Sequence, residues 1–276
     1  MPPGVDIFLL PSDQGNGERL CVHHTPAGGQ ALGAVLYVHP WAEEMNKSRR
    51  MAALQARALA AAGYEVLQID LYGCGDSSGD FADASWAHWV GDIVQAARWL
   101  QERLAAPLCI WGLRAGALLA VQAAAVLSEP CELLLWQPAL SGRQLLQQFL
   151  RLKLAASMGQ EGPKSSVENL RQELLLGRAV EVAGYVLPPA LAAGLEQASL
   201  VVPANVGHIR WLEVSTRDSP TLLPASAACI EAWRAAGHGV SATAVTGPAF
   251  WQTQEIEDAP ALLSATLAAL REEAAA

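Results

Sequence analysis

Apolar strands alternate with helices along most of this chain, and that alternation limits the fold more than any other feature of the sequence. Strands are predicted at residues 33–40, 64–73, 106–112, 131–140, 208–215 and 239–247. Helices are predicted at residues 48–63, 85–103, 115–127, 225–237 and 259–273. Near-continuous apolar strands connected by helices are typical of a parallel sheet that helices cover on both faces. The sequence therefore predicts an α/β fold with a mostly parallel sheet of about eight strands.

Two segments depart from this alternation. Residues 5–26 have the pattern of an antiparallel hairpin at one edge of the sheet, with its turn at Asn16-Gly17. Residues 143–204 contain two helical stretches and a mixed segment interrupted by Pro188-Pro189. We expect 143–204 to be a helical cap inserted into an α/β core formed by residues 1–142 and 205–276. An ordinary long crossover connection is the alternative.

Charge and composition argue against several classes of function. The formal net charge is -9, and no run of lysines or arginines offers the clustered cations that nucleic acids or anionic membranes require. No apolar run reaches the roughly 18 to 20 residues of a membrane span, and the N-terminus lacks the features of a signal peptide. The cysteines are scattered without CxxC spacing, and no histidine pair has metal-ligand spacing. We expect a cytoplasmic protein without a metal or a cofactor.

A glycine cluster raises the separate hypothesis of a nucleotide-binding domain. Gly73, Gly75 and Gly79 have the spacing GxGxxxG. Their turn does not follow the first strand, and it opens an irregular loop instead of a helix, so the dinucleotide fingerprint is absent. The cluster therefore does not support a nucleotide site.

The residues that directly follow each strand are expected to form the ligand site. In open α/β sheets the ligand crevice lies outside the carboxyl ends of the strands. The segments that follow successive predicted strands contain His39, Pro40 and Trp41, then Cys74, then Leu113, Arg114 and Ala115, then Trp136, then Asp218, and finally Phe250, Trp251 and Glu255. We predict that these residues converge at one edge of the sheet.

The order of these segments resembles the α/β-hydrolase superfamily. The shared features are the His39-Pro40 dipeptide, the loop DLYGCGDSSG, and two glycines around Arg114 that match the G-x-S-x-G turn of a nucleophile. Within the superfamily, the stretches WGLRAGALLA and GPAFWQTQEIEDAP resemble the second hydrolase-like protein associated with bacterial exosortase A systems. The resemblance implies an α/β-hydrolase fold and an esterase-like or thioesterase-like hydrolase. It also implies a link to exopolysaccharide production or envelope protein sorting, with a protein partner from that system.

The catalytic positions that this resemblance implies are mostly replaced. Arg114 stands at the nucleophile position and Phe250 at the histidine position, and only Asp218 matches the acid. A guanidinium stays protonated up to a pKa above about 12, so it is neither a nucleophile nor a base. We therefore expect a non-catalytic protein that binds a ligand or a partner. A hydrolase with an unorthodox site, using Cys74 as nucleophile or Glu255 or Glu257 as the general base for a water, is the alternative.

Arg114 itself has two interpretations. It is expected where a helix begins, beside free backbone N–H groups, so an anionic ligand there would meet both the guanidinium and the helix dipole. Alternatively, it forms a structural ion pair, for which we predict Asp218 as the partner or, failing that, Glu43 or Glu255. The ion pair is favoured, because a charge left unpaired in a crevice is costly.

The neighbouring residues indicate what kind of ligand such a site would hold. The backbone N–H groups of Trp41 and Ala115 are predicted to converge beside Arg114, as in an oxyanion hole. The side chains of Trp41, Trp111, Trp136 and Trp251 are expected to project near the same end of the sheet. Tryptophans at such a rim suit an apolar or sugar-like ligand. Together with the guanidinium, they predict a small anionic, acyl or sugar-like ligand.

Overall fold

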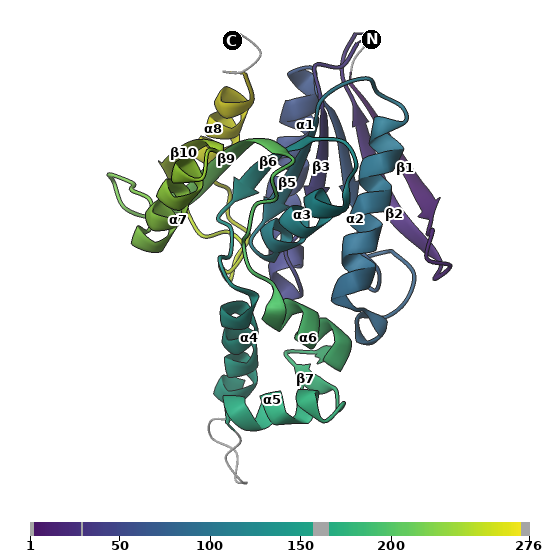
Figure 1. Cartoon of the computed structure of the whole chain (residues 1–276), viewed down its shortest axis with the longest axis vertical. Helices are drawn as coiled ribbons and strands as arrows, with labels where there is room; N and C mark the ends of the chain where they lie inside the picture. The colour runs from purple at the N-terminus through teal and green to yellow at the C-terminus, as the bar shows by residue number, and fades with distance from the viewer. Residues whose placement is uncertain (1–2, 29, 157–165, 272–276) are drawn as a thin grey trace.

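The computed structural model describes residues 3–28, 30–156 and 166–271. Its centre is an eight-stranded sheet with the order β1-β2-β4-β3-β5-β6-β9-β10 (Figure 1). The strands are β1 (Gly4–Pro11), β2 (Glu18–Thr25), β3 (Ala34–Val38), β4 (Glu65–Ile69), β5 (Leu108–Leu113), β6 (Cys131–Trp136), β9 (Val206–Ser215) and β10 (Gly239–Thr246). Strand β2 pairs antiparallel with β1 and β4, and the other neighbours pair parallel. The predicted mostly parallel α/β sheet is confirmed.

Helices cover both faces of the sheet and divide the interior into two apolar cores. On one face pack α2 (Trp86–Gln101), α3 (Ala115–Val126) and α7 (Pro224–Ala235), and on the other pack α1 (Glu43–Ala61) and α8 (Pro260–Arg271). Side chains alternate along a strand, so Ile110 of β5 lies in the first core, whereas Trp111 and Leu113 lie in the second. The position of a residue within its strand therefore decides which core it joins.

The N-terminal hairpin forms as predicted. Gly15 and Gly17 have φ angles of 70° and 90°, which side-chain-bearing residues rarely adopt. The N–H of Ser12 donates to the carbonyl oxygen of Gly17 at 2.9 Å and closes the turn. One face of the hairpin packs on α2, where the Phe8 and Trp99 rings stack with centroids 4.9 Å apart. The hairpin thus extends the sheet beyond β4, to which β2 pairs, and it is anchored to α2.

The chain between β6 and β9 is largely helical, as predicted. It contains α4 (Gly142–Ala156), α5 (Val167–Leu175), β7 (Val180–Val182), β8 (Tyr185–Leu187) and α6 (Pro189–Gln197). These elements lie together beyond one end of the sheet (Figure 1). The β7-β8 hairpin was not predicted, and its turn places Ala183 and Gly184 at φ 49° and 85°. The part of the predicted first helix beyond Ala156 lies outside the described residues, and the assignment of 143–204 as a separate cap domain stays a prediction.

Candidate functional site

The strand-turn-helix predicted around Arg114 is present between β5 and α3. Arg114 has φ 55° and ψ -115°, a strained backbone conformation for a residue with a side chain. Two glycines allow this turn: a Cβ on Gly112 would lie 2.6 Å from Ala117 Cα, and one on Gly116 would lie 2.3 Å from the Val38 carbonyl oxygen. The backbone of a nucleophile turn is therefore kept, with an arginine in its central position.

The Arg114 side chain forms an ion pair with Glu44 in the first turn of α1. Its Nε donates to Glu44 Oε1 at 3.2 Å, and its Cζ lies 5.6 Å from the centre of the Trp251 ring. The prediction that Asp218 is the partner is wrong. The cause is topological: α1 begins after β3, the direct neighbour of β5, whereas the exposed Asp218 follows β9, two strands away.

Glu44 is only partly satisfied by this contact. Its Oε2 is buried and has no hydrogen-bond partner among the described residues. The Arg114 and Glu44 side chains remain 17% and 21% exposed. Burial raises the pKa of the Glu44 carboxyl, and the Arg114 guanidinium opposes that shift. The burial of the Glu44 carboxyl is therefore only partly offset by its contact with Arg114.

Sequence reasoning named the neighbouring residue, Glu43, instead of Glu44. Consecutive residues on a helix point about 100° apart, so only one of the two acids faces the elbow. In the structure, Glu43 accepts a hydrogen bond from the Tyr185 hydroxyl at 3.4 Å. The two consecutive glutamates in the sequence indicated an acidic partner for Arg114. Which of the two faces Arg114 depends on the rotation of α1 about its axis.

A cavity of about 260 Å³ opens beside Arg114, and we call it the elbow pocket. It is lined by the start of α1, one face of α4, the elbow and the connection after β10: Trp41, Ala42, Glu43, Glu44, Lys47, Arg114, Leu145, Gln148, Phe149, Leu152, Trp251 and Gln252. The Trp41 and Phe149 rings pack with centroids 4.5 Å apart. The pocket is thus an aromatic cleft with paired charges at one side, and it contains the predicted residues Trp41, Arg114 and Trp251.

The loop before α1 has the strained shape that an oxyanion loop requires. Ala42 has φ 50° and ψ -132°, and Trp41 is buried. In the described part of the chain, no backbone carbonyl accepts a hydrogen bond from the N–H of Trp41 or of Ala115. Two unpaired amides flanking Arg114 are consistent with the predicted oxyanion-type arrangement, whose convergence on one point stays a prediction.

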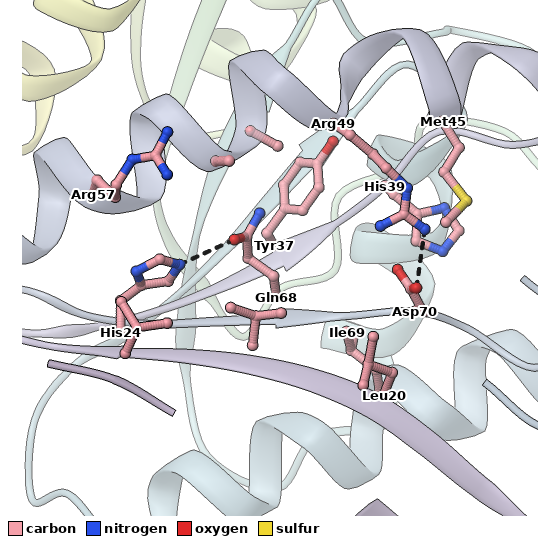
Figure 2. A pocket seen from close by; sticks show the side chains of 14 residues that line it. Leu20, His24, Tyr37, His39, Met45, Arg49, Arg57, Gln68, Ile69 and Asp70 are labelled. Atoms are coloured by element: carbon pink, nitrogen blue, oxygen red, sulfur yellow. Dashed lines mark hydrogen bonds and ion pairs between the residues drawn. The ribbon is translucent and has the colours of Figure 1, made fainter. Parts of the chain in front are cut away.

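His39 does not line the elbow pocket, although the sequence placed it there. Its Nδ1 donates to the Pro40 carbonyl oxygen at 2.6 Å, and its Nε2 accepts from the Leu71 N–H at 3.2 Å. Burial lowers the pKa of the His39 ring, which agrees with a neutral imidazole whose two nitrogens are both engaged. His39 instead lies at a second cavity, beside Arg49 and Asp70 (Figure 2). His39 and Pro40 therefore fix the loop after β3 against the end of β4.

Leu113 and Trp136 are also absent from the elbow pocket. Both are buried in the core under α1 and α8, because the alternation of β5 and β6 turns them to that face. The Trp136 Nε1 donates to Thr266 Oγ1 of α8 at 2.9 Å. The predicted aromatic rim is therefore only partly formed: Trp41 and Trp251 line the pocket, whereas Trp111 and Trp136 are buried in the core.

Phe250 and Asp218, the other two positions of the implied triad, do not line the elbow pocket. Phe250 is buried, with its ring centroid 6.1 Å from that of Trp136 and 5.1 Å from that of Trp251. Asp218 and Glu255 are exposed, and neither lines the elbow pocket. An apolar ring thus fills the place where a histidine would connect nucleophile and acid.

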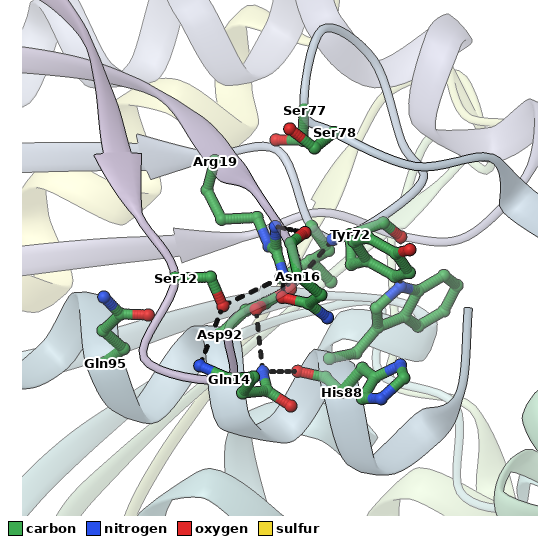
Figure 3. A network of polar contacts seen from close by, with 12 residues as sticks. Ser12, Gln14, Asn16, Arg19, Tyr72, Ser77, Ser78, His88, Asp92 and Gln95 are labelled. Carbon is green, nitrogen blue, oxygen red and sulfur yellow. Dashed lines mark hydrogen bonds and ion pairs between the residues drawn. The ribbon is translucent and has the colours of Figure 1, made fainter. Parts of the chain in front are cut away.

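Cys74 is buried in the loop after β4. A polar network that includes Tyr72 and Ser77 of this loop connects it to β2 and α2 (Figure 3). Asp92 of α2 accepts the Tyr72 N–H at 2.8 Å and forms an ion pair with Arg19 of β2, Nε to Oδ2, at 2.9 Å. Burial raises the pKa of the Cys74 thiol well above its usual range, so the reactive thiolate is disfavoured. Cys74 is not among the residues that line the elbow pocket. The Arg19–Asp92 network was not predicted from the sequence.

The described residues contain neither a membrane-spanning helix nor a candidate metal cluster. No helix in that part of the chain has the length and apolar character needed to cross a membrane. No cluster of three or more histidine, cysteine, aspartate or glutamate side chains there has an arrangement that could hold a metal ion.

Comparison with solved structures identifies the fold. Est1E from Butyrivibrio proteoclasticus with bound ferulic acid is 15% identical, with a TM-score of 0.68 over 98% of this chain and 100% of that chain. A thermostable carboxyl esterase from Bacillus coagulans in complex with glycerol is 16% identical, with a TM-score of 0.65 over 98% of both chains. A serine hydrolase without a lid from Xanthomonas campestris is 14% identical, with a TM-score of 0.57 over 99% of this chain and 94% of that chain.

These likenesses establish an α/β-hydrolase fold with esterase-like neighbours. No curated protein sequence matches the chain. Residues 29–195 match the profile of the serine aminopeptidase, S33 family, a segment that includes the elbow, α1 and most of the chain between β6 and β9. With more than half of its length matched, this chain belongs to the serine aminopeptidase, S33 family of α/β hydrolases.

Proposed function

We propose that the elbow pocket binds a small anionic ligand with a sugar-like or acyl body, and that it does so without triad hydrolysis. The observation that carries the proposal is the position of Arg114 at the centre of a nucleophile turn, with its side chain at an aromatic cavity. A guanidinium there replaces the nucleophile by a permanent positive charge. The chain would then use a hydrolase scaffold for recognition.

The contacts of Arg114 leave part of its guanidinium available. Glu44 engages Nε, and no described residue accepts a hydrogen bond from either terminal nitrogen. The N–H of Ala115, at the start of α3, has no backbone acceptor among the described residues. A carboxylate or phosphate in the pocket would meet both the guanidinium fork and a helix N-terminus. Trp41 and Trp251 would cover the faces of a sugar-like body.

Calorimetric titration with glucuronate, and with glucose as the neutral counterpart, tests this proposal. Binding of glucuronate to the wild type should weaken about tenfold or more in Arg114→Met, since a charge-assisted contact is lost. The matched control is Arg217→Met, because Arg217 is exposed and does not line the pocket. Equal affinity for glucuronate in the wild type and in Arg114→Met would contradict the assignment of Arg114.

A second candidate function, hydrolysis with Glu44 as general base, is favoured by one observation. Glu44 Oε2 is buried at the pocket without a partner, and burial raises the pKa of its carboxyl, as in many catalytic bases. A water beside Oε2 would be the nucleophile. Turnover of p-nitrophenyl acetate that Glu44→Gln abolishes, and that Glu43→Gln retains, would support this candidate. Equal turnover in all three proteins would exclude it.

We further propose a role in a bacterial exosortase and exopolysaccharide system, with a protein partner there and a cytoplasmic location. The support is that both sequence stretches carrying the resemblance contribute to one pocket: Arg114 comes from the first, and Trp251 and Gln252 come from the second. Deletion of the gene in its host should reduce exopolysaccharide output, and the wild-type chain should restore it. Unchanged output in the deletion strain would reject this role.

A further inference from the structure

A second cavity, of about 280 Å³, lies on another side of α1 and shares no lining residue with the elbow pocket (Figure 2). It is enclosed by α1 and by the face of β2, β3 and β4 that points toward this helix. Arg49, Ala53 and Arg57 follow one another at four-residue intervals, so they form a single stripe on the cavity side of α1. The cavity is therefore a separate site built on the same helix.

The rim of this cavity carries more positive than negative charge. Arg49 Nη2 lies 2.9 Å from Asp70 Oδ2, and the arginine side chain remains 47% exposed. Arg57 is exposed and makes no ion pair with any residue that the structure describes. Two guanidinium groups thus face one carboxylate, in a chain whose formal net charge is -9. Such a local excess of positive charge favours an anionic ligand.

Neutral hydrogen-bonding groups lie deeper in the cavity. His24 Nε2 lies 3.2 Å from Gln68 Oε1, and burial lowers the pKa of the His24 ring, so the neutral imidazole donates to the Gln68 carbonyl. This contact leaves the Gln68 amide nitrogen without a partner among the described residues. Nothing in the described part of the chain is hydrogen-bonded to the Tyr37 hydroxyl, which points toward α1 in Figure 2.

The opposite wall of the cavity is apolar and continues onto an uncovered part of the sheet. Leu20 and Val22 of β2 line the cavity, and their partners Leu9 and Ile7 lie opposite them on β1. Ile7 and Leu9 are 64% and 49% exposed, because no described helix covers this face of the hairpin. The apolar part of a ligand too long for the cavity would therefore contact further apolar surface outside it and stay partly shielded from water.

We propose that this second cavity binds an amphipathic monocarboxylate. Its carboxylate would bind the guanidinium of Arg57, and its hydrocarbon chain would lie along the β2 wall. Guanidinium groups bind carboxylates through paired N–H donors, and Arg57 has no competing ion pair in the structure. A cavity of about 280 Å³ is close to the lower end of the usual range for small-molecule sites, which is about 300 Å³. The site is independent of the function proposed for the elbow pocket.

Octanoate is the probe, with octanol as its neutral counterpart, and binding is measured by calorimetry on the full chain. Octanoate should bind the wild type about tenfold more tightly than octanol, and Arg57→Gln should weaken octanoate binding by about the same factor. Ala53→Trp places an indole at the cavity wall and should abolish binding of both compounds. Arg98→Gln, the same change at an exposed position of α2 on the other face of the sheet, should leave binding unchanged.

Variants of the two pockets distinguish binding in this second cavity from binding in the elbow pocket. Arg114→Met should retain octanoate binding that depends on Arg57. Loss of octanoate binding in Arg114→Met, with full binding in Arg57→Gln and Ala53→Trp, would place the carboxylate in the elbow pocket and overturn this proposal. Absence of octanoate binding to the folded wild type would overturn it as well. Arg57→Gln changes an exposed side chain, so its thermal melt should match that of the wild type and confirm that the variant is folded.

Discussion

Two arginine–carboxylate ion pairs in this protein differ in their burial and in the hydrogen bonds around them. The Arg19 and Asp92 side chains are both 0% exposed, and Asp92 also accepts hydrogen bonds from the Tyr72 N–H and Gln14 Nε2. The Arg114 and Glu44 side chains are partly exposed, and one Glu44 oxygen has no partner among the described residues. The first pair is fully buried and surrounded by further hydrogen bonds, whereas the second is partly exposed and borders a cavity.

The difference separates a structural clamp from the proposed ligand site. Burying a charge without partners costs several kcal/mol, so a pair that only stabilises the fold is expected to have its hydrogen-bonding capacity filled. Arg19 meets this expectation at its two terminal nitrogens, which donate to Ser12 Oγ, Asn16 Oδ1 and two backbone carbonyl oxygens, whereas its Nε contacts Asp92 only as an ion pair. The network joins the N-terminal hairpin to α2 and to the loop after β4 (Figure 3). Arg114 keeps free donors at a pocket, and this is what a ligand requires.

The largest expected effect is at the buried pair. Arg19→Met would leave the Asp92 carboxylate buried without its cation, so we expect a loss of about 3 to 5 kcal/mol in the free energy of unfolding. Urea denaturation at pH 7 measures this loss. Arg98→Met, at an exposed position of α2, is the matched control. A loss below about 1 kcal/mol would mean that Arg19–Asp92 is no clamp, and the comparison between the two pairs would fail.

A much smaller effect is expected at the elbow. In Arg114→Met the partly exposed Glu44 carboxyl can reach water or take up a proton, so the loss in unfolding free energy should be about 1 kcal/mol at most. The same urea experiment applies. A loss as large as that of Arg19→Met would assign Arg114 a structural role and weaken the case for a ligand there.

The pH dependence of stability should identify the unsatisfied carboxyl. Because the folded-state pKa of Glu44 is raised, its contribution is fully present below its unfolded pKa of about 4.3 and is lost as pH rises through the folded value. The unfolding free energy of the wild type minus that of Glu44→Gln should therefore fall between pH 4 and pH 7. Urea melts across this range measure it, with Glu43→Gln as the neighbouring control. A difference that grows with pH would mean that the folded-state pKa of Glu44 is lowered, so that Arg114 more than compensates the burial of this carboxyl.

The smallest expected change concerns catalysis. Arg114→Ser restores the hydroxyl at the elbow, but Phe250 supplies no base to activate it, so p-nitrophenyl acetate hydrolysis should stay at the level of Arg114→Ala. A stopped or continuous absorbance assay compares the two variants. Turnover by the serine variant alone would reveal a base that the triad positions do not contain, with Glu44 as the first residue to test.

Much of the fold could be predicted because the signals are local. Apolar runs, helix periodicity and the spacing of Gly112 and Gly116 report backbone geometry within a few residues, and the strands, α3 and the strained turn at Arg114 follow from them. The β7-β8 hairpin was missed because its strands have three residues each, too few to display an alternation. Pocket membership was predicted less well, since Leu113 and Trp136 follow the alternation of their strands into the core.

The sequence by itself determined the tight turn between β5 and α3 with Arg114 at its centre, because this turn is encoded by contiguous residues. Only the tertiary structure decided the partner of that arginine. Arg114 and Glu44 are 70 residues apart, and the choice of Glu44 over Glu43 depends on how α1 is rotated against the sheet. That rotation is set by the packing of Met51, Ala52 and Leu59 in the core under α1, a long-range property that no local pattern reports.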